Sequence, residues 1–597
     1  MKKLRIYKKL VLPGCLALVG MLSSCSMFDD FLTVYPTNQI TSEQFWEDKN
    51  DLTSVVASCY RQLTTDGVSQ RMFVWGELRS DNFLLKSESD EDIKNIMNAN
   101  LLPTNGWYDW SSYYRGIGLC NLVLSKGPSI IGKDPSFTQS DWKPIAAECK
   151  TLRALYYFYL IRAFRDVPFN LKASDTSEGA RNPMPQVPEQ TTLTYLINDL
   201  EGCKDDGMTN YGNDAFNACR ITKNAIYSLL ADMYLWRAAK NTCPDSAAKY
   251  PGMAASDYAK CIDCCDYVIK DKLYQFQKNK KRYYGYGDDS KTPLPMFTPS
   301  TMGRIEDNEY GDLFGSKGSL ESVFEIAYDG SNNSNNNGLV TKFYGGMSGS
   351  TFKIGLVGGS ALFQDVDGKP DLQSHAYSKT DLRAAESIRY VNNADAASNS
   401  FQVVKYIAQG IEVLDGTNVL KKDAGQPDNV NYSNIRTQSN MDANWIVYRV
   451  SDLLLMKAEA IACLYPDGDP KLKDAYDLTY AVLDRSNPAI LPTDKLKYSS
   501  YGSAKSILDF VMRERQREFF GEGKRWFDLV RIAMRDNTTE NMLNLLSAKY
   551  TTNASAIKAK LATLNSLYSP VYKNEMKINT ALVQNPAWVV DETIVKN

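Results

Sequence analysis

Apolar residues recur at helical spacing along several long segments of this chain. In residues 143–165, Leu152, Tyr156, Tyr159 and Ala163 fall on one face of a helix with 3.6 residues per turn. The same spacing is found in residues 222–240 and 445–464. A helix with one apolar face needs a neighbour to cover that face, so the pattern predicts a body of packed helices.

The residues between these segments predict that the helices are arranged in pairs. Thr222 is a favourable N-cap for the second segment. The third segment ends at Tyr465-Pro466-Asp467-Gly468, and Asp469-Pro470 restarts a helix as N-cap and first helical residue. Such pairs span about 30–35 residues and match tetratricopeptide-like units, although the strict signature of those repeats is missing. We therefore predict an all-α protein, mostly helical with irregular loops, in which tetratricopeptide-like helix pairs form a right-handed superhelical scaffold.

Residues 276–440 differ from this helical pattern. They contain Lys280–Gly287 (KKRYYGYG), an Asn-rich run at 332–337 and repeated glycines up to Gly359. Long irregular insertions usually have a function, and loops on a rigid scaffold are where recognition is commonly found. We predict a loop-rich, ligand-facing insertion over 276–440; a variable surface elaboration without a ligand is the alternative. The flanking parts are then an N-terminal helical-repeat half, 46–275, and a C-terminal helical half, 441–597.

The N-terminal residues have the layout of a secretory signal. Its cationic residues are Lys2, Lys3, Arg5, Lys8 and Lys9. The apolar run from Leu10 to Leu22 that follows is too short to span a membrane as a mature helix. Because Leu22-Ser23-Ser24-Cys25 resembles a lipobox, we expect a signal peptide over 1–24, diacylglycerol on the Cys25 thiol and a lipidated tether over 25–45. An ordinary signal peptide with an incidental cysteine is the alternative.

Charge and histidine content argue against several function classes. Removing the leader takes away five positive charges and changes the formal net charge from −2 to −7, which disfavours nucleic acid as a partner. His375 is the only histidine, which argues against most catalytic mechanisms in which a histidine imidazole activates a nucleophile. Aromatic residues make up 11% of the chain, with 36 tyrosines and 9 tryptophans. The mature protein is therefore expected to be rich in flat side chains.

Cysteines do not form a recognisable metal motif. Cys261, Cys264 and Cys265 lack the second Cys-x-x-Cys half of a zinc site. Helix-packed thiols or a local disulfide are the preferred interpretations, and we expect no metal and no cofactor.

Several segments resemble one known family. Glu514–Arg531 reads ERQREFFGEGKRWFDLVR, a helix, a glycine break and a second helix, and resembles the signature of the SusD/RagB family. Ala147–Phe169 (AECKTLRALYYFYLIRAFRDVPF), Trp110–Asn121 and Tyr448–Ala460 are similar to earlier family segments in the expected order. Two departures are Arg165, where the family often has glycine, and Ser569-Pro570-Val571-Tyr572 in place of a closing Pro-Ile-Pro element.

The resemblance implies a non-catalytic surface lipoprotein of the outer membrane that faces the cell exterior. Family members partner SusC-like TonB-dependent barrel transporters, so the implied function is to bind nutrient oligosaccharides and deliver them to such a transporter. Peptides or host glycoprotein sugars are alternative cargoes. A secreted helical glycoside hydrolase is the less favoured alternative, because no pair of acidic residues on opposed loops can be identified.

The charged residues of the 514–531 segment are interpreted as structural. Glu514 and Glu518 lie one helical turn apart among several arginines, and guanidinium groups favour ionised carboxylates. A general acid needs the opposite, a raised pKa. Bidentate Arg–carboxylate pairs would instead fix the crossing of two helices.

Aromatic residues beside short polar ones are the candidate ligand contacts, because sugar rings stack on aromatic faces while polar groups bind the hydroxyls. Two groups fit this description: Trp75 with Asp81 and Asn82, and Tyr283, Tyr284 and Tyr286 followed by Asp288 and Asp289. Either group could instead belong to the core, where aromatic residues of helical proteins are more often found.

Overall fold

The computed structural model describes residues 45–589 except 87–89, 174–182, 299–309, 333, 364–375, 391–400, 415–416, 418, 421, 424–425, 428–429, 548 and 551–552. The expected signal peptide, Cys25 and the tether up to residue 44 therefore lie outside the described residues, as does His375. Within the described ranges, no helix is both long and apolar enough to cross a membrane.

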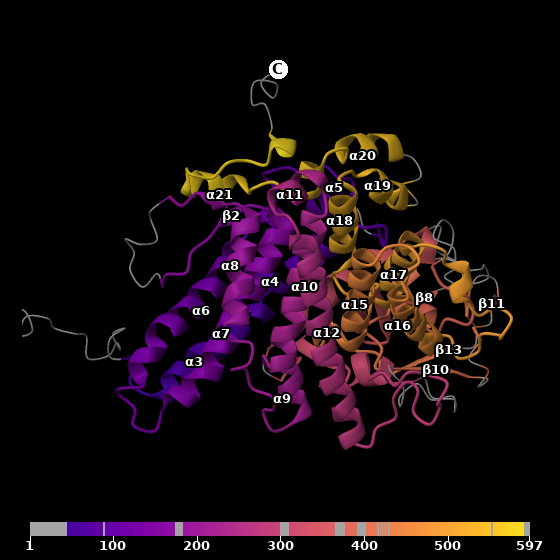
Figure 1. Ribbon diagram of the computed structural model, residues 1–597, viewed down its shortest axis with the longest axis horizontal. Coiled ribbons are helices and arrows are strands. Elements are labelled where there is room, and N and C mark those ends of the chain that lie inside the picture. The colour runs from indigo at the N-terminus through magenta and orange to yellow at the C-terminus, as the bar shows by residue number, and fades with distance from the viewer. Residues whose placement is uncertain are drawn as a thin grey trace, which may run out of the picture.

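Long helices form the scaffold. They are α3 (Lys49–Thr64), α6 (Ser111–Ile130), α7 (Gln139–Phe164), α8 (Glu189–Glu201), α10 (Lys223–Asn241), α12 (Met253–Lys278), α15 (Val450–Leu464), α16 (Lys471–Ser486) and α17 (Ala504–Glu518). In Figure 1 they form one row, from α3 and α6 at the left through α10 and α12 to α15, α16 and α17 at the right. Each helix packs on the next in this order, and the predicted mostly helical fold is confirmed.

The other α-helices of the described residues are shorter. They are α4 (Asp66–Gly76), α5 (Glu91–Met97), α9 (Asp214–Cys219), α11 (Pro244–Lys249), α13 (Gly338–Phe343), α14 (Arg383–Ser387), α18 (Arg525–Asp536), α19 (Glu540–Leu546), α20 (Ala554–Lys560) and α21 (Lys573–Ile578). The C-terminal segment crosses back over the N-terminal half, where the Ser569 amide donates to the Ala163 carbonyl at 2.7 Å and the Lys573 amide to the Pro103 carbonyl at 2.8 Å.

Local signals mark the starts of α10 and α16 close to where the sequence predicts them. The Thr222 hydroxyl caps α10 by accepting from the Ala225 amide. Helix α16 begins at Lys471, one residue later than predicted, with Pro470 as its N-cap. The Asp469 carboxylate still accepts a hydrogen bond from the Lys471 amide at 2.8 Å, so Asp469 stabilises the helix start from one position further out.

The insertion contains small antiparallel sheets as well as loops. Together with the short strands elsewhere, the strands are β1 (Phe83–Leu85), β2 (Val167–Pro168), β3 (Gln186–Val187), β4 (Ser322–Ile326), β5 (Gly345–Ser348), β6 (Thr351–Ile354), β7 (Val357–Gly359), β8 (Ile388–Tyr390), β9 (Phe401–Val403), β10 (Gly410–Val413), β11 (Lys422–Asp423), β12 (Gln426–Pro427), β13 (Val430–Ser433) and β14 (Trp445–Arg449). The largest sheet has the order β1-β7-β9-β8, and β2 pairs with β3, β4 with β14, β5 with β6, β10 with β13 and β11 with β12.

Residues 445–449 differ from their prediction, because they form β14 rather than the first turn of a helix. All five side chains of β14 are buried, as are all five of its partner β4. A continuously buried apolar run is compatible with either a strand or a helix, and here pairing with a segment more than 100 residues earlier decides for the strand.

Arg165 ends α7 in an unusual backbone conformation. Its φ of +69° lies in the region that favours glycine, which is the residue the family often has here. The guanidinium group donates to the Asp166 carboxylate at 2.9 Å and to the Asn565 side chain at 2.6 Å. These two bonds offset part of the backbone cost and link α7 to the C-terminal segment.

Cysteines in the described part of the chain are free thiols, and Cys261, Cys264 and Cys265 are buried on α12. This agrees with the helix-packed interpretation rather than with a local disulfide.

Candidate functional site

The charged residues of the 514–531 segment lie in the interior, where α17 meets α18. The Glu518 carboxylate accepts hydrogen bonds from three arginines, Arg383 at 2.8 Å, Arg449 at 2.5 Å and Arg485 at 2.6 Å. Within α17, Arg517 donates two hydrogen bonds to one oxygen of Glu514, whereas Arg531 of α18 binds both carboxylate oxygens of Glu459 on α15. Arg515 of α17 donates to Asp528 of α18 at 3.0 Å. The pairs between helices therefore fix how α15, α17 and α18 cross.

Glu518 and Asp528 are held in their ionised form. Burial alone would raise the pKa of Glu518, but the charges of Arg485, Arg449 and Arg383 hold it well below its usual value. Arg515 and Arg531 likewise outweigh burial and lower the pKa of Asp528. A carboxylate with a lowered pKa cannot serve as a general acid, so the geometry supports the structural interpretation of this segment.

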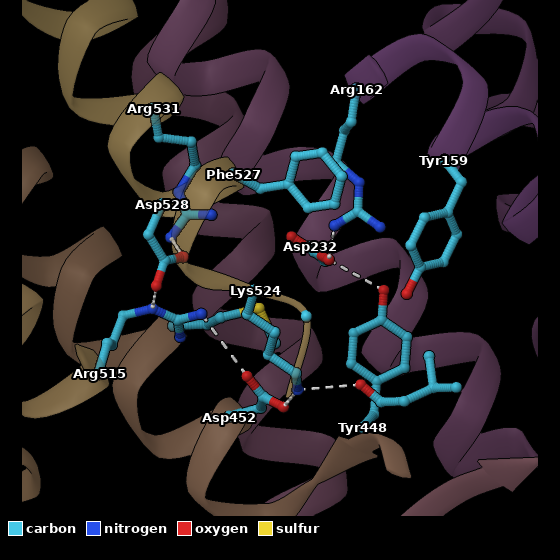
Figure 2. A pocket seen from close by; sticks show the side chains of 13 residues that line it. Tyr159, Arg162, Asp232, Tyr448, Asp452, Arg515, Lys524, Phe527, Asp528 and Arg531 are labelled. Atoms are coloured by element: carbon cyan, nitrogen blue, oxygen red, sulfur yellow. Dashed lines mark hydrogen bonds and ion pairs between the residues drawn. The ribbon is translucent and has the colours of Figure 1, made fainter. Parts of the chain in front are cut away.

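Figure 2 shows the small space enclosed at this junction. Asp232 accepts from the Tyr448 hydroxyl at 2.9 Å, and Lys524 binds Asp452 and the Val447 carbonyl. The space measures about 20 Å³, enough for a water molecule and too small for a sugar ring. We therefore do not place a ligand there.

The first candidate group, Trp75 with Asp81 and Asn82, is buried. The three side chains are 3%, 1% and 0% exposed. The Trp75 indole donates to the Trp107 carbonyl at 2.9 Å, and its ring stacks on Tyr113 with the centroids 4.8 Å apart.

Both polar members of this group bind other protein groups. Asp81 accepts from two nitrogens of Arg525, at 2.8 and 2.9 Å, and Asn82 donates to the Glu77 carboxylate at 2.6 Å. This burial leaves almost no surface of Trp75, Asp81 or Asn82 for a ligand to contact. We correct the expectation accordingly and assign the group to packing.

The second candidate group lies on a surface loop that follows α12. Tyr283 and Tyr286 form an edge-to-face pair with ring centroids 5.3 Å apart and an interplanar angle of 89°. Tyr286 is 59% exposed and Tyr283 is half-buried. We call this pair the tyrosine platform.

Tyr284 has a different role, because it anchors the loop. Its side chain is 6% exposed and packs with Leu294 and Met296 against α15 and α16. Its hydroxyl donates to the Asp484 carboxylate at 3.0 Å, and burial together with that charge raises the pKa of Tyr284 above its usual value. Tyr284 therefore faces the core while its two neighbours face solvent.

Backbone bonds hold the platform in place. The Tyr284 amide donates to the Met296 carbonyl at 2.9 Å, and the Leu294 amide donates to the Tyr284 carbonyl at 3.0 Å. A hollow of about 400 Å³ lies beside the two rings, with Arg282, Asp288 and Lys291 in its lining. An exposed aromatic pair next to an open hollow with charged groups is a suitable arrangement for stacking a sugar ring and binding its hydroxyls.

Sequence reasoning missed the residues that fix this loop. Asp484 and Tyr480 on α16 meet the loop although they lie about 200 positions away in the chain. Nothing local to α16 marks these residues, because their importance comes from the segment packed against them.

Two family models match the chain. The model described as "SusD family" matches residues 321–588, and the model described as "Starch-binding associating with outer membrane" matches residues 30–235. SusD-like protein P38 of Formosa agariphila is 24% identical over 518 residues, which cover 86% of this chain and 89% of the relative. A SusD-like protein of Bacteroides ovatus is 22% identical and covers 88% of this chain and 83% of its own length.

Solved structures share the fold. A SusD superfamily protein from Bacteroides vulgatus superposes with a TM-score of 0.61 at 17% identity, covering 91% of this chain and 100% of the other. One from Parabacteroides distasonis has a TM-score of 0.60 at 20% identity and covers 90% of this chain and 99% of the other. The matched segments include the α17–α18 junction and the paired helices of the N-terminal half, and the chain belongs to the SusD family.

Proposed function

We propose that the protein is a surface lipoprotein that captures oligosaccharides outside the cell and delivers them to a SusC-like TonB-dependent barrel transporter, acting as its lid. Members of the SusD family are non-catalytic binding proteins. The match to a model described as starch-binding and associating with the outer membrane supports both the ligand class and the location. In this proposal Cys25 carries the lipid, and the insertion 276–440 faces the ligand.

The observation that carries the proposal is the tyrosine platform beside its hollow. The faces of sugar rings are weakly polar and pack on aromatic rings, and the position of Tyr283 and Tyr286 at the surface leaves both rings accessible. Arg282 and Asp288 supply groups that bind hydroxyls from the lining of the same hollow. Modest affinity suits this function, because captured cargo must also be released.

Binding to a panel of oligosaccharides tests the proposal. The mature protein is titrated by calorimetry with neutral and acidic oligosaccharides, and with peptides and host glycoprotein glycans as the alternative cargoes. Each mixture is then analysed for hydrolysis products. Binding without turnover is expected. Turnover by the protein alone would contradict the proposal and favour a glycoside hydrolase.

The tyrosine platform offers a matched control. In the double variant Tyr283→Ala/Tyr286→Ala, glycan binding should fall at least about tenfold, because each lost stacking contact weakens binding severalfold. Tyr274→Ala removes a ring that is equally exposed, at 60%, on α12 and outside the hollow beside the platform. Tyr274→Ala should bind like the parent protein; equal losses in the two variants would argue against the platform.

The lipid anchor and the transporter partner are tested in cells. A Cys25→Ser variant should lose palmitate incorporation and leave the membrane fraction, because one residue carries the acyl chains. The parent protein should co-purify with a large barrel protein from detergent-solubilised outer membranes. Retention of Cys25→Ser at the membrane would contradict the anchor, and recovery of the parent protein alone would argue against the lid function.

A further inference from the structure

A second hollow lies next to the tyrosine platform. It measures about 550 Å³ and is formed by the loop 284–294, α15, α16 and the segment that follows α16. The two hollows share Tyr284 and Lys291 in their linings, so the second one extends the surface on which the platform lies. We call it the lysine groove.

Lysines reach this groove from every side. Lys291 comes from the loop, Lys457 from α15, Lys473 from α16 and Lys495 from the segment after α16. Three aspartates are also in the lining. Asp477 binds Lys473, and Asp266 outside the lining binds Lys457, so the excess positive charge lies at Lys291 and Lys495. A local excess of positive charge in a concave surface concentrates anionic ligands.

Asp484 is the centre of the cationic side of the groove. Its carboxylate, 5% exposed, lies 2.5 Å from the Lys291 ammonium and 3.3 Å from the Lys495 ammonium. Tyr284 and Tyr480 also donate their hydroxyls to it. One carboxylate therefore binds two ammonium groups and neutralises only one of them.

Both ammonium groups keep donors for a ligand. The side chains of Lys291 and Lys495 are 35% and 40% exposed, although the carboxylate between them is buried. A lysine ammonium has three N–H donors, and each of these lysines makes one hydrogen bond to Asp484. The half-buried Tyr480 ring borders the same opening.

We propose that the lysine groove binds the anionic groups of an acidic oligosaccharide, one that carries carboxylates or sulfates, with Lys291 and Lys495 as the principal donors. This inference rests on the proposed glycan-binding function and names its substrate class. A chain seated in both hollows places one sugar on the tyrosine platform and the anionic group of a nearby sugar on the two lysines. The charge-assisted hydrogen bonds then select acidic over neutral chains.

Calorimetry of the mature protein tests the substrate class. Oligogalacturonate supplies carboxylates, a sulfated galactan oligosaccharide supplies sulfates, and a neutral malto-oligosaccharide of the same length is the reference. At least one acidic probe should bind about tenfold or more tightly than the neutral one, and salt should weaken that binding. The two acidic probes separate the carboxylate from the sulfate as the preferred group.

Lysine variants test whether Lys291 and Lys495 cause the preference for acidic oligosaccharides. Lys495→Met should weaken binding of the acidic probe about tenfold and leave the neutral probe unchanged, because it removes one charged donor. Lys291→Met should act in the same direction. Lys505→Met removes an equally charged side chain that is 73% exposed on α17 and lies outside the groove, so it should change neither affinity. Lys495→Met is the decisive variant, because Lys291 also binds the loop to Asp484.

The possible failures are distinguishable. Equal affinity for acidic and neutral probes, or equal affinities in Lys495→Met and the parent protein, would overturn the acidic substrate class and leave glycan binding intact. Failure to bind any oligosaccharide would overturn the proposed function as well.

Discussion

Two groups of similar composition occupy opposite environments in this protein. Trp75, Asp81 and Asn82 are buried, whereas Tyr283 and Tyr286 lie on a surface loop with open space beside them. Both groups combine aromatic rings with short polar residues, which is the composition expected of a sugar-binding surface. The difference between the two groups therefore comes from tertiary packing and not from their composition.

Partners from distant segments account for that difference. Asp81 binds Arg525, and the Glu77 carboxylate binds Asn82 and also accepts from the Lys524 amide. Both of these partners belong to the α17–α18 junction, more than 400 residues later. Of Tyr283, Tyr284 and Tyr286, only Tyr284 hydrogen-bonds such a partner, Asp484, and it is the one tyrosine of the three that is buried. A distant charged partner thus accompanies the burial of Asp81 and of Tyr284, whereas Trp75 is packed against Tyr113 and binds the Trp107 carbonyl.

The largest expected effect comes from removing one side of a buried ion pair. Asp81→Ala leaves the buried Arg525 guanidinium without its bidentate partner and should lower the free energy of unfolding by about 3–5 kcal/mol. Urea unfolding followed by circular dichroism measures the change. Asp288→Ala, the same substitution in the tyrosine loop, is the control.

Asp288 is exposed and binds only its neighbour Ser290 and local backbone. Asp288→Ala should therefore leave the unfolding midpoint unchanged. If Asp81→Ala were as stable as Asp288→Ala, the structural role given to the buried group would be wrong.

Acid should expose the contribution of the buried carboxylates. Burial opposes ionisation of Glu522, but Arg449 and Lys405 lower its pKa from the usual 4.5 to about 2. A carboxylate whose pKa is lower in the folded state stabilises the fold at a pH above its unfolded value, and this stabilisation disappears as the pH falls through the folded value. We expect the parent protein to lose about 3 kcal/mol from this group between pH 4.5 and pH 2.

Glu522→Gln separates this contribution from general acid unfolding. The variant should be less stable at neutral pH, because Arg449 and Lys405 lose a charged partner. Its unfolding midpoint should then fall less steeply than that of the parent protein as the pH drops from 4.5 to 2. Parallel pH profiles for the two proteins would contradict the assignment.

A smaller effect is expected at the glycine break of the family signature. Gly521 has a φ of +73°, and a Cβ atom added to it would lie 2.9 Å from the Tyr344 hydroxyl, which donates to the Gly521 carbonyl. Gly521→Ala should therefore cost about 1–3 kcal/mol of unfolding free energy.

Gly502→Ala is the matched control, because Gly502 has open space around its Cβ position and no positive φ. It should leave stability unchanged or raise it slightly, since alanine lowers the entropy of the unfolded chain. Equal stabilities of the two alanine variants would show that the break tolerates a side chain.

Much of the fold could be predicted from the sequence, because the signals for the helices are local. Thr222 caps its helix as predicted, and the apolar faces of α7, α10 and α15 are buried. The strand β14 could not be predicted in this way, because pairing with β4 selects it. Residues 276–440 were expected to be irregular but contain small sheets. Their short strands are selected by pairing with other segments, which local sequence signals do not show.

The candidate site could be predicted only in part, for the same reason. Composition pointed to two aromatic groups. The periodicity of the sequence does not distinguish a buried ring near a helix end, such as Trp75, from an exposed ring in a loop, such as Tyr286. The glycines at 285 and 287 and the charges around them mark the Tyr283 segment as a loop, and that is the only local difference. The lysine groove has no local signature, because its four lysines come from four separate segments of the chain.

The smallest effect tests which part of Tyr286 contacts the sugar. Tyr286→Ala should weaken glycan binding about three- to tenfold, because it removes one ring of the tyrosine platform. Tyr286→Phe keeps the ring and removes the hydroxyl, so its affinity should match that of the parent protein if the ring face carries the contact. Neither variant should move the unfolding midpoint, because the side chain is 59% exposed. An affinity loss in Tyr286→Phe equal to that in Tyr286→Ala would assign the contact to the hydroxyl, and the tyrosine platform would then act through hydrogen bonding rather than stacking.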